Sequence, residues 1–385
     1  MSDILFEIKK ENLETGLRGY PCGYCTTSYV DAQKGLFYAG QPVSLLAYKR
    51  PEEVLCLLYY GKEASLEEKK CFLQEIQKRA ALSAKTIQAI EALPREGHPM
   101  KLFSAALLIV GMLEGKNDYK EDCLNVIAKM PHLTAVVINY HAGWGKTPNP
   151  EPTLGYMESF TKMLQVKGAK VEELQKVFSL FNILHYDHGG GNLSAFVGKA
   201  VASSLEDMYG SLASAMCALE GPRHGRANQD CLQFVKAVLD EVGENATEAQ
   251  VEALIRSKLQ AGDLVFGFGH AVLRVEDPRA TVQYEYIEKH YPNHPLAKIA
   301  RHLRKVGPKV LAENPKISNP YPNVDAISGV LLSAAGFPYP QYFTVLFGLA
   351  RCVGISIQIV YERVEAREGK GTPIVRPKYL YQPKK

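Results

Sequence analysis

Helical periodicity runs through nearly the whole chain, and it constrains the fold more than any other feature. From residue 51 onward, the segments between turns repeat apolar residues at helical spacing. No alternation of strands with helices interrupts them, so a doubly wound α/β fold is excluded. The only β-like runs, residues 26–30 and 35–38, flank a turn and predict a small hairpin. The sequence therefore predicts an all-α, mainly helical protein.

Two of the predicted helices carry clear start signals. Pro51 precedes two glutamates, which is typical of a first helical turn. Ser65 precedes Glu68 at capping-box spacing. The small-residue-rich segment 193–219 is predicted to form a central buried helix. The remaining predicted helices span residues 102–113, 122–130, 133–140, 154–165, 171–185, 229–242, 247–261, 280–290, 295–313, 325–335 and 341–366.

The length of the chain, 385 residues, suits two domains. The best breaks lie near residues 221–225 and 315–322, where glycine and proline interrupt the helical pattern. We therefore expect a discontinuous large domain, residues 1–224 and 323–385, and a small domain, residues 225–322.

The composition gives no sign of a nucleic-acid or membrane partner. A formal net charge of +4 is too small over this length to indicate nucleic-acid binding. We find no apolar run of the roughly 20 residues that span a bilayer. The first residues have neither the apolar core of a secretory signal nor the Arg/Ser-rich face of a transit peptide. Eight cysteines, isolated apart from Cys22 and Cys25, lack zinc-site spacing, so we expect no metal site and a cytoplasmic location.

One stretch, residues 267–279, combines the residue types of an anion site with acid–base chemistry. Two glycines allow a tight turn, His270 can transfer a proton near neutral pH, and Arg274 and Arg279 can bind carboxylates or phosphates. The plainer interpretation is a turn between helices, with Asp277 as a capping residue and the arginines at the surface.

Four further stretches have the same character. They are residues 185–192, residues 221–229, residues 319–325, and Arg351 together with Arg376. A loop histidine is more often a hydrogen-bonding residue than a catalyst, and an acid at a helix start is often only a cap. Arg351 is harder to explain in this way, because it lies in an otherwise apolar helix and should have an anionic partner.

Together these stretches resemble the citrate synthase family. The resemblance covers most of the chain, and its motifs follow in the family's order. They are DHGGGN (187–192), GPRHGRANQ (221–229), GFGHAVLRVEDPR (267–279), NPYPNVDAISGVLL (319–332), YFTVLFGLAR (342–351) and VRPK (375–378). Their form is similar to that of mitochondrial-type enzymes, which implies a two-domain helical fold and a homodimer.

The resemblance implies a Claisen-type condensation of acetyl-CoA with oxaloacetate, followed by hydrolysis of citryl-CoA to citrate and CoA. This is the entry step of the tricarboxylic acid cycle. Asp325 matches the base that removes a proton from the thioester methyl group. His224 matches the neutral donor to the enolate oxygen, and a helix N-terminus and burial would keep its pKa low. His270 matches the group that protonates the ketone.

The resemblance also assigns binding residues. Oxaloacetate or citrate would contact His188, His270, Arg279, Arg351 and Arg376, and Arg376 would reach the site of the neighbouring subunit. CoA would contact Gly267, Phe268, Gly269, Arg274 and Lys316. No cofactor is implied, because acetyl-CoA is itself a substrate, and the implied partners are the two small-molecule substrates and a second copy of the chain.

The sequence departs from the family's pattern around the implied CoA site and around His224. The departures are Ser318, Ala39, Gly189, Arg223 and Arg226. Two other functions remain open. A 2-methylcitrate synthase would use propionyl-CoA with the same residues, since one methylene is worth only about 1–3 kcal/mol of discrimination. A non-catalytic CoA-binding paralogue would keep the fold alone, although all three implied catalytic residues are present.

Overall fold

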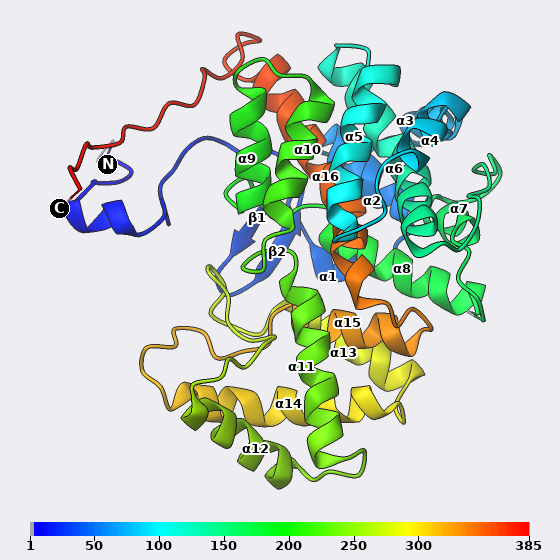
Figure 1. The fold of residues 1–385 in the computed structure, drawn as a ribbon. Coiled ribbons are helices and arrows are strands. Elements are labelled where there is room, and N and C mark those ends of the chain that lie inside the picture. Colours follow the sequence, from blue (N-terminus) through cyan, green and yellow to red (C-terminus); the bar gives the residue numbers. More distant parts are fainter. Residues whose placement is uncertain (1–3, 169, 385) are drawn as a thin grey trace.

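The computed structural model describes residues 4–168 and 170–384 of the chain. Helices dominate these residues (Figure 1), so the predicted all-α class is confirmed. The α-helices are α1 (Val43–Leu46), α2 (Pro51–Tyr60), α3 (Leu66–Arg79), α4 (Ala84–Glu91), α5 (Pro99–Glu114), α6 (Tyr119–Ala142), α7 (Tyr156–Met163), α8 (Val171–His185), α9 (Leu193–Ala202), α10 (Met208–Leu219), α11 (Ala227–Val242), α12 (Glu248–Ala261), α13 (Pro278–His290), α14 (Pro295–Ala312), α15 (Asp325–Ala334) and α16 (Phe343–Val360).

The predicted hairpin is confirmed. Strands β1 (Ser28–Asp31) and β2 (Gly35–Tyr38) pair antiparallel, and the short β3 (Gln41–Pro42) pairs with β2. The Asp31 carboxylate closes the turn by accepting the backbone N–H groups of residues 33 and 34, both at 2.8 Å. A Cβ on Gly35 would lie 2.5 Å from Cγ of Pro278, so the hairpin packs tightly against the first turn of α13.

Two helix predictions were wrong in their boundaries. Residues 122–130 and 133–140 form one helix, α6, which continues through Pro131. Proline lacks an N–H donor, but nearly every residue from 122 to 139 is buried, so tertiary packing outweighs the lost hydrogen bond. Segment 193–219 instead divides into α9 and α10, because Asp207 starts a new helix by accepting the N–H of Gly210 at 2.8 Å.

Helix α16 is the apolar centre of the molecule. Residues 340–365, which include it, are long and apolar enough to cross a membrane, with a mean hydropathy of 1.8. The sequence-based statement that no run reaches this length was therefore wrong. The apolar window is entirely buried among other helices, as in the core helix of a globular protein. Figure 1 shows α16 running behind α9 and α10 and beside α6.

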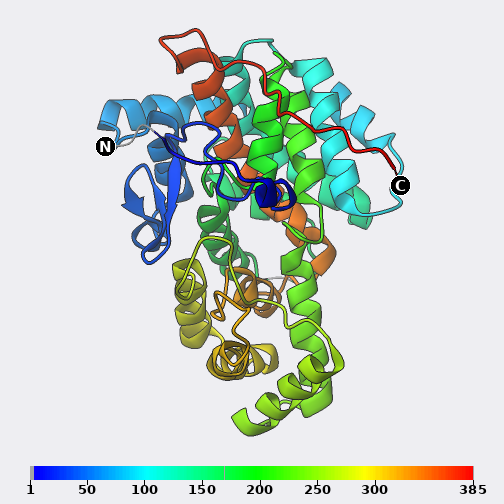
Figure 2. The same ribbon diagram turned by 90° about the vertical axis from the view of Figure 1, so that its left-hand side faces the viewer.

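Figures 1 and 2 show a second group of helices, α11 to α14, below the larger group, with α15 at the border. Within this lower group α12 packs on α14, and α11 and α14 pack on α15. The domain boundaries at residues 224/225 and 322/323 remain predictions. A π-helical turn, Tyr361–Glu365, follows α16, and after residue 370 the chain leaves the helical body as an extended tail.

Candidate active site

The glycine turn at residues 267–269 pairs with the segment that leads into α15. Gly267 and Gly269 have φ angles of 85° and 84°, in the left-handed region that favours glycine. The N–H of Gly269 donates to the carbonyl oxygen of Tyr321 at 3.0 Å, and that of Asn323 donates to Gly267 at 2.9 Å. A Cβ on Gly267 would lie only 2.8 Å from Cα of Ala326. Two of the predicted motifs therefore lie in direct contact.

Asp325 is the first residue of α15. Its backbone N–H donates to Oδ1 of Asn323 at 3.0 Å, which fixes the start of the helix. Burial raises the pKa of Asp325 to about 7, although the positive charges of Arg279 and Arg351 act in the opposite direction. A carboxyl group with a pKa near neutrality is suited to removing a proton from a weak carbon acid.

His224 lies in the turn between α10 and α11. Its Nε2 accepts the backbone N–H of Ser194 at 3.2 Å and lies 2.9 Å from the Ser194 hydroxyl. Because an N–H group can only donate, Nε2 carries no proton and the neutral ring carries its hydrogen on Nδ1. Burial, helped by the charge of Arg351, lowers the pKa of His224 to about 4. The ring is therefore a neutral donor.

His270 has the opposite arrangement of ring nitrogens. Its Nδ1 accepts the backbone N–H groups of Val272 and Leu273, each at 3.0 Å, so the neutral ring carries its hydrogen on Nε2. Burial, together with the charge of Arg279, lowers the pKa of His270 to about 4. The ring centroid lies 5.3 Å from that of His188, so two neutral imidazoles lie side by side.

Arg279 joins His188 to a buried carboxylate. Its Nη2 lies 2.7 Å from Oδ2 of Asp277 and 3.2 Å from Nε2 of His188. Asp277 is also the N-cap of α13, as the plainer interpretation expected, since its Oδ1 accepts the backbone N–H of Arg279 at 2.9 Å. Burial, with the charge of Arg279, lowers the pKa of His188 well below its usual range. Asp277 therefore orients a guanidinium that in turn orients an imidazole.

Arg351 is buried without a carboxylate partner. Only 2% of its surface is exposed; its Nε donates to the carbonyl oxygen of His185, and its Nη1 to Oδ1 of Asn192, each at 3.2 Å. Its guanidinium lies 4.6 Å from the ring centroid of Phe347. Burial lowers its pKa to about 10. Within residues 4–168 and 170–384 no carboxylate lies at ion-pair distance, so a bound anion would complete its coordination.

Several of the predicted binding residues lie apart from this cluster. Arg376 is exposed in the extended tail, and Lys316 is exposed after α14. Arg274 folds back onto its own loop, with Nη1 donating to the carbonyl oxygens of residues 272 and 273 at 2.9 and 2.8 Å. The ring of Phe268 packs against Gly307 of α14. The structure thus joins the predicted acid–base and oxaloacetate residues of one chain and places the glycine turn beside them, and it leaves Lys316 and Arg376 outside.

Sequence reasoning missed the residues that hold the predicted ones in place. Ser194 fixes His224, Asn192 contacts Arg351, and Asn323 fixes Asp325. Asn192 is also the N-cap of α9, where it accepts the N–H of Ala195 at 3.2 Å. A capping residue at the end of the histidine- and glycine-rich motif 187–192 was the signal available in the sequence.

The departures from the family's pattern have different surroundings. Gly189 has a φ angle of 73° and donates its N–H to the Ser28 hydroxyl at 2.7 Å, so the loop conformation favours glycine there. Arg226 is the N-cap residue of α11, and its Nε lies 3.8 Å from Oδ1 of Asp230 in that helix. The others are Arg223 and Ser318, which are exposed, and Ala39, which has a φ angle of 44°.

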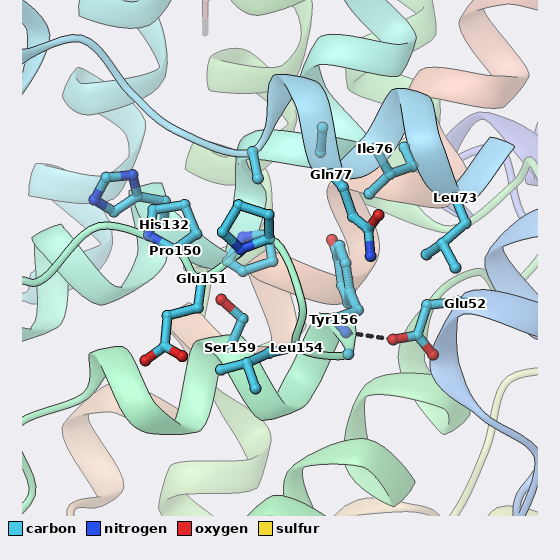
Figure 3. A pocket seen from close by; sticks show the side chains of 15 residues that line it. Glu52, Leu73, Ile76, Gln77, His132, Pro150, Glu151, Leu154, Tyr156 and Ser159 are labelled. Atoms are coloured by element: carbon cyan, nitrogen blue, oxygen red, sulfur yellow. Dashed lines mark hydrogen bonds between the residues drawn. The ribbon is translucent and has the colours of Figure 1, made fainter. Parts of the chain in front are cut away.

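A separate small cavity lies among α2, α3, α6 and α7 (Figure 3). Glu52 accepts the backbone N–H of Tyr156 at its edge, and Ser159 and His132 line the interior. None of the predicted catalytic or binding residues contributes to its wall. This cavity is therefore no part of the cluster around Asp325.

Comparison with known proteins gives one consistent result. A family model described as "Citrate synthase, C-terminal domain" matches residues 16–378. The mitochondrial citrate synthase of Citrus maxima is 37% identical over 387 residues, covering 94% of this chain and 80% of its own. Citrate synthase 4, mitochondrial, of Arabidopsis thaliana is 36% identical with the same coverage.

Solved structures agree with these relatives. The Thermoplasma acidophilum citrate synthase, in a ternary complex with carboxymethyl coenzyme A and oxaloacetate, superposes with a TM-score of 0.83 at 27% identity, covering 96% of both chains. The Thermotoga maritima citrate synthase gives a TM-score of 0.79 at 28% identity, covering 95% of this chain and 94% of its own.

The expected cytoplasmic location is contradicted. The relatives from Citrus maxima, Arabidopsis thaliana and Daucus carota are all mitochondrial citrate synthases, and they point to the mitochondrion. Dispersed thiols indicate a reducing environment without specifying which compartment provides it. Targeting signals are recognised by receptors and are separate from the fold, so the features used for the prediction do not determine the compartment.

The fold, the arrangement of motifs and the relatives thus lead to the same conclusion. The family model spans most of the chain, and the curated relatives exceed one-third identity over nearly all of it. The six motifs that carried the resemblance fall within this alignment or at its edge. The chain belongs to the citrate synthase family of acyltransferases.

Proposed function

We propose that this chain condenses acetyl-CoA with oxaloacetate and hydrolyses the resulting citryl-CoA, using the residues gathered around Asp325. One observation carries the assignment. A carboxyl group with a pKa near 7 shares one region with two neutral histidines, and the two rings present different nitrogens as donors. Two buried arginines in the same region provide positive charge for a dicarboxylate.

The first step is removal of a proton from the methyl group of acetyl-CoA. The Asp325 carboxylate takes the proton, and the electron pair of the broken C–H bond moves toward the thioester carbonyl oxygen. The Nδ1–H of His224 donates a hydrogen bond to that oxygen as negative charge develops on it. A preorganised neutral donor of this kind contributes on the order of 3–4 kcal/mol to the stability of the transition state.

The second step forms the carbon–carbon bond. The enolate carbon attacks the ketone carbon of oxaloacetate, and the Nε2–H of His270 transfers its proton to the ketone oxygen. Citryl-CoA is the product, and water then attacks the thioester carbonyl as the C–S bond breaks, which gives citrate and the CoA thiol. Of the two protons of that water and the one held by Asp325, two protonate the departing thiolate and His270, and the third leaves to solvent. Because Nδ1 of His270 accepts two backbone N–H groups, the tautomer with hydrogen on Nε2 is held in place before the reaction.

Charged and polar groups orient oxaloacetate for this attack. Arg279, Arg351 and His188 contact it from one chain, and Arg376 contacts it from the second chain of a homodimer with shared sites. The exposed position of Arg376, in a tail that leaves its own helical body, supports a role in a neighbouring subunit. On the CoA side, the backbone at residues 267–269, Arg274 and Lys316 bind the nucleotide part. No cofactor takes part.

Release of the CoA thiol tests the proposal. Purified protein is mixed with oxaloacetate and either acetyl-CoA or propionyl-CoA, and kcat/KM is compared for the two thioesters. We expect a higher kcat/KM for acetyl-CoA. A higher value for propionyl-CoA would make the chain a 2-methylcitrate synthase, and no thiol release with either would make it a non-catalytic paralogue.

A further inference from the structure

Asp187 is a buried carboxylate that none of the steps above uses. Its side chain is fully buried, and it accepts four hydrogen bonds. Oδ2 receives the hydroxyls of Thr27 and Ser28, the latter at 2.8 Å. Oδ1 receives the Gln358 amide at 2.7 Å and the backbone N–H of His188 at 2.9 Å. No lysine or arginine of the described chain lies within ion-pair distance of it.

These four donors come from three separate parts of the fold. Thr27 and Ser28 lead into and begin β1, Gln358 lies near the end of α16, and His188 is in the loop between α8 and α9. Close packing holds the carboxylate between them, because a Cβ on Gly354 of α16 would lie 2.7 Å from Cβ of Asp187. Asp187 therefore joins the hairpin, the central helix and the active-site loop.

A buried carboxylate is costly unless hydrogen bonds replace its water. Hydrogen bonds to a charged group are stronger than those between neutral groups, so four of them can offset that cost. Three of the donors belong to ordinary structural residues. The fourth is the backbone of His188, whose ring is 3.2 Å from Arg279 and beside His270. The position of this ring thus depends on the backbone that Asp187 holds.

We propose that Asp187 is a positioning residue for oxaloacetate. Its carboxylate fixes the backbone N–H of His188, and this keeps the His188 ring in contact with Arg279 and in line with His270. Asp187 itself does not touch the substrate. The inference rests on the proposed function, because it assigns the effect to the oxaloacetate half of that reaction.

The main test compares Asp187→Ala with Asp187→Asn. Alanine removes the acceptor of the His188 N–H, and we expect the KM for oxaloacetate to rise roughly 30-fold or more, since misplacement by about 1 Å can cost about 100-fold. The KM for acetyl-CoA at saturating oxaloacetate should stay within about threefold, because the acyl side is formed by other residues. Asparagine keeps an acceptor for His188, and the Thr27 and Ser28 hydroxyls can rotate to accept its N–H₂. We expect its KM for oxaloacetate within about threefold of the wild type.

Asp122→Ala is the matched control. Asp122 is also a buried aspartate, and it accepts the backbone N–H of Lys116 at 2.9 Å, but it contacts none of the proposed catalytic residues. We expect this variant to lose stability while both KM values stay unchanged.

A second pair of variants, at Thr27, tests the proposal if Asp187→Ala does not fold. Thr27→Val removes one donor to the carboxylate and should raise the KM for oxaloacetate about threefold to tenfold, and Thr27→Ser should restore it.

The outcomes separate the two proposals. If the wild type releases no thiol, the proposed function fails, and calorimetric binding of oxaloacetate to the same variants then tests the role of Asp187. The role of Asp187 is overturned if Asp187→Ala leaves the affinity for oxaloacetate unchanged or raises both KM values equally. It is also overturned if Asp187→Asn is as impaired as Asp187→Ala, because the effect would then come from the charge rather than from the bond to His188.

Discussion

Oδ2 of Asp277 lies 2.7 Å from Nη2 of Arg279, and both side chains are buried. Arg351, the other buried arginine of the site, is held only by two neutral oxygens and an aromatic ring. The two arginines therefore differ in what their removal leaves behind. Loss of Arg279 leaves the ion-paired carboxylate of Asp277 unpaired, whereas loss of Arg351 breaks no ion pair among the described residues.

Substitution by methionine should separate these two cases. We expect Arg279→Met to lower the free energy of unfolding by about 3–5 kcal/mol, the cost of breaking a buried ion pair. Arg351→Met should lower it by less than about 1.5 kcal/mol, since a hydrophobic side chain of similar volume replaces a desolvated charge. Both variants should lose calorimetric binding of oxaloacetate. Equal losses of stability in urea unfolding would show that Arg351 has a carboxylate partner in solution.

The pKa of Asp325 predicts the pH dependence of the reaction. A base acts only when ionised, so kcat/KM should fall about tenfold per pH unit below an apparent pKa of about 7. His224 and His270 have pKa values of about 4, so both stay neutral across this range and add no limb above pH 5. Thiol release between pH 5 and pH 9, at substrate concentrations below KM, measures this part of the pH profile.

Asp325→Asn is the control for this assignment. The amide cannot take a proton, so thiol release should fall by at least about a thousandfold and lose its acid limb. Oxaloacetate should still bind, because Arg279 and Arg351 are unchanged. An acid limb that persists in the residual activity would assign the titration to another group.

The hydrogen bond from Ser194 to His224 predicts the effect of removing the imidazole. His224→Ala should lower kcat about 100- to 1000-fold, which is the usual loss when one donor to a developing oxyanion is removed. His224→Asn retains a side-chain N–H and should recover part of this loss. The binding constant for oxaloacetate, measured without acetyl-CoA, should change by less than about threefold. A loss of oxaloacetate affinity without a loss of kcat would show that His224 binds oxaloacetate and does not stabilise the enolate of acetyl-CoA.

Gly267 offers a test of the contact between the glycine turn and α15. Gly267 and Gly262 have nearly equal φ angles, 85° and 86°, but a Cβ on Gly262 meets nothing within 4 Å. Gly262→Ala should therefore cost only the backbone strain of about 1–2 kcal/mol and leave kcat unchanged. Gly267→Ala adds a clash with Ala326, so we expect a larger loss of stability and at least about a hundredfold loss of kcat. Equal behaviour of the two variants would show that the turn can move away from α15 at no cost.

Much of the site was predictable because its residues lie in short motifs. Asp325, His224 and His270 each follow a turn, and turns leave strong local signals such as glycine and proline. The class of the fold followed from helical periodicity, since one face of nearly every helix is buried. Helix ends were less predictable, as α6 shows, because burial of its whole length outweighs the local preference of Pro131.

Most of the supporting contacts were not predictable, because they join residues far apart in the sequence. Thr27 is 160 positions from Asp187, and Arg351 is 159 positions from Asn192. The sequence predicted that the near-buried Arg351 has an anionic partner. Within the described residues this arginine has only neutral hydrogen-bond partners, so the anionic partner remains a prediction. Only the coordinates show which groups surround this side chain.

The exposed tail makes Arg376 the residue whose role depends most on a second chain. If Arg376 completes the site of a neighbouring subunit, two inactive variants should complement each other. In a mixed dimer of Arg376→Ala and Asp325→Asn, one site combines the intact Asp325 of the first chain with the intact Arg376 of the second. The other site lacks both. Each variant alone has no complete site.

Mixing the two variants at equal concentrations, with unfolding and refolding to exchange subunits, should give about half of the dimers as mixed species. Each has one working site of two, so activity should reach about one quarter of the wild-type value. A mixture of Arg376→Ala with Arg376→Ala that carries a distinguishing tag is the control and should stay inactive. If Arg376 instead acted within its own chain, no mixed dimer would contain a complete site, and the complementing mixture would stay as inactive as its components.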